Sequence, residues 1–261
     1  MSVSLENKLV ELLVNLRLNG SQQSGLAERL IPKDRDVAYR VASKVADQLG
    51  WDVAGWKIAA NNSRMQDQLR TNEPIYGRVF AGKILESPAR VEYSRQCSPI
   101  PEPEYMVLLG SDLPSRSTPY TRAEIIKSVE AIHIGMELAE CRFVHDEFFP
   151  PLSAILADGS GGGSLVVGPA ISDWQNRDIS NQRITLSANG VLRREGVARD
   201  SIDDPITPVH WLANELSSKG NGLKASQIIS TGTLTGMLHP KVGETFIADF
   251  GPFGEVQATY A

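Results

Sequence analysis

Residues 100–110, IPEPEYMVLLG, contain the pattern that decides the fold. The first half has two carboxylates one residue apart, Glu102 and Glu104, and the second half is an apolar run that ends at Gly110. A short apolar run bounded by Pro and Gly is typical of a buried strand. The stretch therefore predicts a β-strand that runs into the interior and carries two acids at its entrance.

Similar short runs follow one another from about residue 51 to the C-terminus, separated by Gly, Pro, Asn and Asp. They read GWKIAA, MELAECRF, SLVVGPAI, RITLSANGVL, SQIISTG, ETFIADF and EVQATY. Asn189-Gly190 and residues 251–254 are expected to turn two hairpins. Strands outnumber helices and hairpins are frequent, so regular βαβ alternation fits poorly. We expect an α+β fold with a large mixed sheet.

Helical spacing is strongest in the first 70 residues. Two apolar stripes mark two helices: Leu5, Leu9, Leu12, Leu13 and Leu16, and then Val37, Val41, Val45 and Leu49. Gly50 follows the second stripe as a stop signal. We therefore expect residues 1–72 to form an N-terminal helical segment and residues 73–261 to form a mixed-sheet catalytic domain.

Two further helices are predicted within the sheet region. Thr121 and Glu124 have the spacing of a capping box and precede an apolar stripe that continues through Val129 and Ile132. Pro208 is expected in the first turn of the other helix, which ends before Gly220.

Composition excludes several classes of protein. The chain has 261 residues, 26 Lys and Arg against 31 Asp and Glu, a formal net charge of -5 and 41% hydrophobic residues, which suffices for a sizeable core. Without a dense basic stripe, we expect no nucleic-acid partner. No stretch approaches the ~18 apolar residues of a membrane span, so we expect no membrane partner. Cys97 and Cys141 form no Cys-x-x-Cys pair, which favours two thiols in a reducing, cytoplasmic compartment.

The acids of the opening stretch are candidate metal ligands. Residues i and i+2 of a strand project to the same side, so Glu102 and Glu104 are expected to point together. Glu137 lies in a second short apolar segment and shares a face with Ala139 and Cys141. Three acids from two strands suit a hard divalent cation such as Mg²⁺, with Mn²⁺ as the alternative. The competing interpretation of the Glu102 pair is two solvated acids at a strand entrance.

Lys57 interrupts an otherwise apolar strand and is a candidate cation beside these acids. Its competing interpretation is a surface lysine with a buried stem. The four histidines are scattered, although His145 and His239 lie in loops that could border a cleft. The glycine-rich run at residues 158–164 lacks the spacing of a phosphate or dinucleotide loop, so we expect a flexible turn there.

Taken together, these segments resemble the fumarylacetoacetate hydrolase superfamily, and within it the branch of 2-keto-4-pentenoate (2-hydroxypentadienoate) hydratases and 4-oxalocrotonate decarboxylases. The resemblance rests on the order of GWKIAANNSRMQDQL, EPIYGRVF, PEPEYMVLLGSDLP, MELAECRF, LADGSGGGSLVVG, WLANEL, LKASQIISTGTLTG and VGETFIADFGPFGEV. It implies a mixed sheet rolled into a barrel-like domain, and a small 2-oxo or 2-hydroxydienoic acid as substrate.

The resemblance also implies roles for individual residues. Glu102, Glu104 and Glu137 would hold the divalent metal, and Lys57 and Glu102 would be catalytic. Substrate contacts would come from Lys57, Ser160 and Thr233, and a homo-oligomer is expected. The sequence departs from the branch at Gly82, where an acidic residue is usual, and at Gly159, where an amide is usual.

The leading functional hypothesis is a metal-dependent lyase that hydrates a 2-hydroxy-2,4-dienoate through a metal-stabilised enolate. A decarboxylase of a vinylogous 2-oxo diacid needs the same ligands and the same enolate, and only release of CO₂ separates the two. An acylpyruvate C–C hydrolase is a third hypothesis. A fourth is a catalytically silent relative that binds a 2-oxo acid, which the two glycines motivate.

Overall fold

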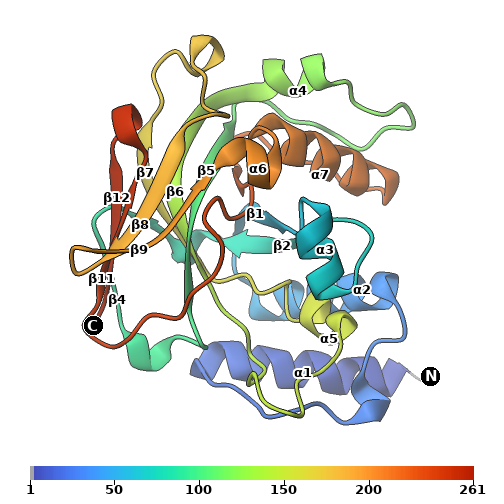
Figure 1. The fold of residues 1–261 in the computed structure, drawn as a ribbon. Helices are drawn as coiled ribbons and strands as arrows, with labels where there is room; N and C mark the ends of the chain where they lie inside the picture. Colours follow the sequence, from blue (N-terminus) through green and yellow to red (C-terminus); the bar gives the residue numbers. More distant parts are fainter. Residues whose placement is uncertain (1–2) are drawn as a thin grey trace.

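The computed structural model describes residues 3–261 (Figure 1). The α-helices are α1 Val3–Asn19, α2 Arg35–Leu49, α3 Ser63–Leu69, α4 Arg122–Ser128, α5 Leu152–Ala157, α6 Ala198–Ile202 and α7 Ile206–Ser218. The strands are β1 Val53–Ala59, β2 Ile75–Phe80, β3 Ile84–Glu86, β4 Ala89–Val91, β5 Ile100–Leu109, β6 Val129–Ala139, β7 Ser164–Ala170, β8 Arg183–Ala188, β9 Val191–Val197, β10 Ile228–Ser230, β11 Thr245–Asp249 and β12 Glu255–Tyr260.

The strands form two sheets. The larger has the order β2-β1-β10-β5-β6-β7-β3 and curls into a half-barrel, and the smaller has the order β4-β12-β11-β8-β9. β1 pairs with β10, β3 with β7, and β4 with β12 in parallel, whereas the remaining pairs are antiparallel. The expected α+β fold with a mixed, barrel-like sheet is confirmed.

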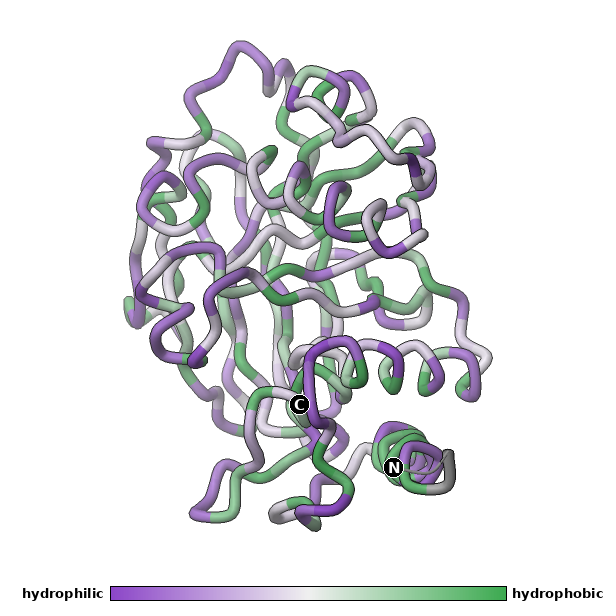
Figure 2. Tube along the Cα trace, turned by 90° about the vertical axis from the view of Figure 1, so that its right-hand side faces the viewer, coloured by the Kyte–Doolittle hydropathy of each residue, from purple (hydrophilic) through white to green (hydrophobic). Residues whose placement is uncertain are grey.

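β5, the strand predicted from the opening stretch, lies at the centre of the large sheet between β10 and β6. Tyr105, Met106 and Val107 are successive residues with no exposed surface. Both faces of β5 are therefore covered, which explains why its sequence is a continuous apolar run and does not alternate. In Figure 2 the strands through the middle of the molecule carry long hydrophobic stretches, and many of the outer loops are hydrophilic.

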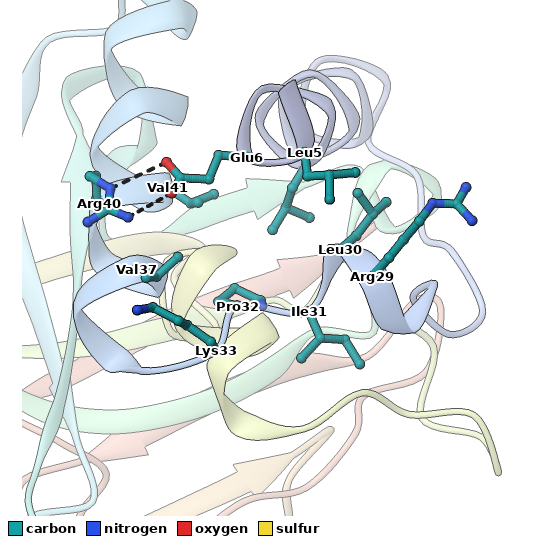
Figure 3. A pocket seen from close by; sticks show the side chains of 11 residues that line it. Leu5, Glu6, Arg29, Leu30, Ile31, Pro32, Lys33, Val37, Arg40 and Val41 are labelled. Carbon is teal, nitrogen blue, oxygen red and sulfur yellow. Dashed lines mark hydrogen bonds and ion pairs between the residues drawn. The ribbon is translucent and has the colours of Figure 1, made fainter. Parts of the chain in front are cut away.

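The N-terminal helices form as the apolar stripes predict. Asp34 caps α2 by accepting a hydrogen bond from the backbone N–H of Val37, and Gly50 ends the helix in the left-handed conformation at φ 63°. Glu6 of α1 is paired with Arg40 of α2 at 2.7 Å, beside a pocket of about 230 Å³ between the two helices (Figure 3). Within residues 3–261, none of the helices combines the length and apolar composition that a bilayer crossing needs.

The division at residue 72 stays a prediction. β1 lies before that residue, yet it is hydrogen-bonded to β2 on one side and to β10 on the other. The N-terminal segment thus supplies a strand to the large sheet in addition to its helices.

The helix predicted after the capping box is shorter than its apolar stripe. Thr121 and Glu124 form the capping box, but α4 ends at Ser128, and Val129 and Ile132 belong to β6. Pairing with β5, which sets Ile132 against Val107, outweighs the helical spacing of the stripe. Both predicted hairpins are present, between β8 and β9 and between β11 and β12.

Candidate active site

The three acids predicted as metal ligands lie together in the interior. The antiparallel register of β5 and β6 sets Glu102 directly opposite Glu137, and Glu104 is two residues further along β5. One carboxylate oxygen from each of the three lies within 4.8 Å of the other two. Their exposed fractions are 8%, 1% and 0% for Glu102, Glu104 and Glu137. The acids are therefore buried and are not the solvated pair of the competing interpretation.

Glu104 is held from the neighbouring strand. The hydroxyl of Ser230 in β10 and the backbone N–H of Gly232, at 2.7 Å, both donate hydrogen bonds to Oε2 of Glu104. Sequence reasoning missed Ser230 and Gly232, because only the pairing of β10 with β5 brings residue 230 beside residue 106. These two bonds fix one oxygen of Glu104 and leave the other for a ligand.

Glu137 differs from Glu104 in its hydrogen bonding. In the part of the chain that the structure describes, neither of its buried carboxylate oxygens has a hydrogen-bond partner. The nearest cation is Lys57, whose Nζ lies 3.6 Å from Oε1. A buried carboxylate without donors is costly. Three converging carboxylates with unfilled oxygens are the donor set that a hard divalent cation requires, so the residues fit such an ion.

Burial raises the pKa of all three acids, and repulsion between carboxylates adds to the shift for Glu102 and Glu104. Burial, followed by the charge of Glu137, raises the pKa of Glu102 to about 8. The pKa of Glu104 is raised well above its usual range by burial and by the other two carboxylates. Burial also raises the pKa of Glu137, although Lys57 opposes the shift. Ionisation of all three acids would therefore create an excess of negative charge for which one lysine does not compensate.

Lys57 of β1 is 3% exposed, so it is not the surface lysine of the competing interpretation. Its Nζ donates a hydrogen bond of 3.0 Å to the backbone oxygen of Ser160. Burial favours the neutral amine, but the attraction of Glu137, Glu102 and Glu104 outweighs burial and raises the pKa of Lys57. The side chain is therefore a cation held in a fixed position beside the acids.

A cavity of about 380 Å³ opens onto this cluster. Lys57, Glu102, Glu104, Ser160 and Thr233 all contribute to its wall. The hydroxyl of Ser160 donates to the backbone oxygen of Tyr76 at 2.6 Å, and that of Thr233 donates to Gly236 at 3.3 Å. The structure thus brings the predicted substrate-binding residues to the same cavity as Glu102 and Glu104, two of the three predicted metal ligands.

Two of the four histidines border the cavity, as their loop positions suggested. His145 and His239 line the cavity, whereas His133 and His210 bond to the backbone oxygens of Gly168 and Tyr120. Burial, and then the proximity of His239, lower the pKa of His145.

The glycine-rich run contains a buried ion pair that the sequence did not reveal. Asp158 accepts hydrogen bonds from the Nε of Arg142 at 2.9 Å and from its backbone N–H at 3.0 Å. Arg142 also donates to the backbone oxygen of Gly162. Arg17 of α1 also donates a hydrogen bond to the backbone oxygen of Asp158. The predicted turn is present at residues 158–161, and hydrogen bonds from two arginines hold it.

The two departures from the branch have structural explanations. Gly82 is exposed and lies in another pocket with Trp51 and Lys83, so an acid there would not line this cavity. Gly159 has φ +84°, and a Cβ at that residue would lie 2.8 Å from Nη2 of Arg17. A side chain at 159 would therefore compete with Arg17 for space.

Comparison with known proteins identifies the family. The family model of the fumarylacetoacetate (FAA) hydrolase C-terminal domain matches residues 84–260. The chain belongs to this family. 2-Keto-4-pentenoate hydratase 1 of Dechloromonas aromatica (strain RCB) is 25% identical over 246 residues, which are 93% of this chain and 92% of that protein. 2-Oxo-hept-4-ene-1,7-dioate hydratase of Escherichia coli is 25% identical over 224 residues, which are 84% and 82% of the two chains.

The fold of this fumarylacetoacetate hydrolase family member is similar to that of a solved decarboxylase. 4-Oxalocrotonate decarboxylase from Pseudomonas putida G7, complexed with magnesium and adipate, superposes with a TM-score of 0.90 at 19% identity and covers 100% of this chain and 99% of its own. The similarity extends over the N-terminal helices as well as the family's C-terminal region.

Proposed function

We propose that this protein is a divalent-metal-dependent hydratase that adds water to a 2-hydroxy-2,4-dienoate, the tautomer of a 2-oxo-4-enoate. The observation that carries the proposal is the convergence of three buried carboxylates, two of which line a cavity together with a buried lysine. Within the described part of the chain, both oxygens of the third, Glu137, lack hydrogen-bond partners. The hydratase relatives from Dechloromonas aromatica and Escherichia coli support the same reaction.

Glu102, Glu104 and Glu137 would hold Mg²⁺ or Mn²⁺. When bound, the metal supplies a Lewis acid for the keto oxygen of a 2-oxo acid, and so favours the negative charge that hydration develops there. The residues around it orient this chemistry. Ser230 and Gly232 keep Glu104 in one rotamer through two hydrogen bonds, so that its free oxygen keeps a constant direction.

Lys57 would bind the substrate carboxylate. One N–H of its ammonium is taken by the backbone oxygen of Ser160, and the side chain lines the cavity. An ammonium has three N–H donors, so the two remaining ones are available to the substrate carboxylate. Ser160 and Thr233 would add polar contacts to the substrate. Glu102, the most exposed of the three acids, is our candidate for moving a proton to or from the substrate.

A decarboxylase of a vinylogous 2-oxo diacid is the second candidate. The similarity to 4-oxalocrotonate decarboxylase from Pseudomonas putida G7 favours it, because the fold matches over both chains. Hydration and decarboxylation would use the same metal ligands and the same lysine. The residues of the cluster therefore do not distinguish the two reactions.

The test is to incubate the Mg²⁺-loaded protein with a 2-hydroxy-2,4-dienoate and to follow ultraviolet absorbance and CO₂ together. We expect the absorbance to fall without release of CO₂. Glu104→Gln should abolish the reaction, and Glu130→Gln, an exposed acid on β6, is the matched control that should retain it. Release of CO₂ from a 2-oxo diacid without any hydration would instead establish the decarboxylase. A cytoplasmic location and a homo-oligomeric assembly stay predictions.

A further inference from the structure

The cavity above the acids has a second wall that the proposed chemistry does not use. The acids come from β5 and β6, but the other wall comes from α3 and from residues 145–155, both outside the large sheet (Figure 1). It is formed by partly buried apolar side chains: Met65, Leu69, Phe149, Leu152 and Ile155. Apolar side chains that face an open cavity gain free energy when an apolar ligand removes them from water.

The volume of the cavity exceeds what a five-carbon dienoic acid needs. About 380 Å³ lies within the ~300–1,000 Å³ range of sites that take drug-sized ligands. A short substrate bound at the acids and Lys57 would leave the wall of α3 and residues 145–155 in contact with water.

The charges around the cavity disfavour a second carboxylate. Among the described residues that line it, Lys57 is the only lysine or arginine, and the proposed function already assigns its free N–H groups to the carboxylate of the 2-oxo acid end. The lining also contains Glu140, an acid. The other basic side chains in the lining are His145 and His239. Burial and the proximity of His239 lower the pKa of His145 and so favour its neutral imidazole.

We propose that the cavity is built for a 2-oxo acid whose distal end is an uncharged, apolar chain longer than that of 2-oxopentenoate, with that chain lying against Met65, Leu69, Leu152 and Ile155. This inference rests on the proposed function, because the acids and Lys57 must take the 2-oxo acid end. Such a substrate is a monoacid, in contrast to the diacids of 4-oxalocrotonate decarboxylases and 2-oxo-hept-4-ene-1,7-dioate hydratases.

Binding of saturated 2-oxo acids tests this inference without requiring turnover. The Mg²⁺-loaded full chain is titrated by calorimetry with 2-oxopentanoate, 2-oxooctanoate and 2-oxoheptanedioate. Each buried methylene strengthens binding about fourfold, so 2-oxooctanoate should bind at least about tenfold more tightly than 2-oxopentanoate. The diacid should bind no more tightly than 2-oxopentanoate, because its second carboxylate would lose water without gaining a cation.

Two variants place a cation in the apolar wall. Leu69→Lys, at the last residue of α3, and Leu152→Lys, at the first residue of α5, should each shift the ratio of diacid to 2-oxooctanoate affinity at least tenfold towards the diacid. Leu69→Met, the matched control, keeps the wall apolar and should retain the wild-type ratio. Two positions on separate helices keep the test decisive if one variant fails to fold.

The outcomes separate the two proposals. If 2-oxooctanoate binds tightly but no dienoate is hydrated, the proposed reaction is wrong and the apolar subsite stands. If dienoates are hydrated but the diacid binds as tightly as 2-oxooctanoate, or chain length has no effect, the apolar subsite is wrong and the reaction stands. If no 2-oxo acid binds in the presence of Mg²⁺, both are wrong.

Discussion

Two clusters of buried charge, each assembled from distant parts of the sequence, differ in their balance of positive and negative groups. The first, Glu102, Glu104, Glu137 and Lys57, has three carboxylates for one ammonium, and both oxygens of Glu137 lack hydrogen-bond partners. The second, Arg17, Arg142, Asp158 and Glu140, has two guanidinium groups for two carboxylates, and Asp158 accepts three hydrogen bonds from Arg142.

The difference indicates what each cluster does. A cluster whose charges balance is compatible with a folded chain on its own, although Oε1 of Glu140 has no hydrogen-bond partner among the described residues. Here it joins α1 to the loop that carries Ser160. An unbalanced cluster needs a further cation, and it lies where a cavity gives access to one. We therefore regard the Arg142–Asp158 cluster as structural and the Glu102–Glu104–Glu137 cluster as functional, and each prediction below tests this distinction.

The largest effect is expected for Glu104→Gln. Loss of one of three charged ligands should lower kcat/KM by more than about 100-fold. Mutation of residues that only hydrogen-bond to metal ligands already lowers metal affinity or activity by about 10–100-fold. Stability of the metal-free protein should be retained or increased, because one of three repelling carboxylates is removed. Steady-state kinetics and urea unfolding measure the two effects, and a variant with wild-type turnover would refute the assignment of Glu104.

Arg142→Met should show the opposite pattern. It removes the main cation of buried Asp158 and leaves only Arg17, 3.5 Å from Oδ1, so the free energy of unfolding should fall by about 3–5 kcal/mol. Arg142→Met combined with Asp158→Leu should be less destabilised than Arg142→Met alone, because one cation and one anion are then removed together and the number of charges of each sign stays equal. Urea denaturation measures both, and a single variant as stable as the wild type would contradict the structural role.

Lys57→Ala should separate catalysis from metal binding. We expect kcat/KM to fall by about 100-fold, while the affinity for Mg²⁺ stays the same or increases because a like charge is removed from beside the ligands. Kinetics and metal titration on the same preparation measure this split. Full kcat/KM would remove Lys57 from the mechanism, and loss of the metal would show that the lysine only supports the site.

Gly159→Ala tests the packing of Arg17. The residue has φ +84°, and the new Cβ would meet the guanidinium, so we expect a loss of about 1–2 kcal/mol of unfolding free energy. Gly190→Ala, also at positive φ but with open space around it, is the matched control for backbone strain alone. Equal losses in the two variants would mean that Arg17 makes no steric demand at 159.

The smallest effect is expected for Glu6 on α1. Hydrogen bonds from Arg40 and Lys44 lower its pKa to about 2, so the carboxylate stabilises the fold above its unfolded pKa, near 4.5. That contribution is lost as the pH falls through about 2. The pair is partly exposed, so Glu6→Gln should cost less than ~1 kcal/mol at pH 7 and nothing at pH 2. Thermal unfolding at both pH values measures it, and equal costs would contradict the pairing.

Local features were predictable from the sequence. The central strand followed from residues 100–110, the two N-terminal helices from their apolar stripes, and the common face of Glu102 and Glu104 from their spacing. The hairpin at Asn189-Gly190 followed from turn chemistry, and both residues have positive φ.

What the sequence could not supply depends on pairing between distant segments. The register that sets Glu137 opposite Glu102 joins residues 35 positions apart, and Ser230 reaches Glu104 only because β10 is inserted between β1 and β5. Arg142 lies 3.5 Å from Glu140, two residues away in the sequence, but its main partner is the distant Asp158 at 2.9 Å. The apolar stripe after Thr121 also looked helical until its pairing with β5 was known.

The most direct test of the central claim is a metal titration of the unbalanced cluster. Equilibrium dialysis of the metal-free wild-type protein against Mg²⁺ or Mn²⁺ should give one saturable site per chain, and Glu137→Gln should remove that site while Glu130→Gln retains it. The absence of a saturable site in the wild type, or an unchanged site in Glu137→Gln, would contradict the account.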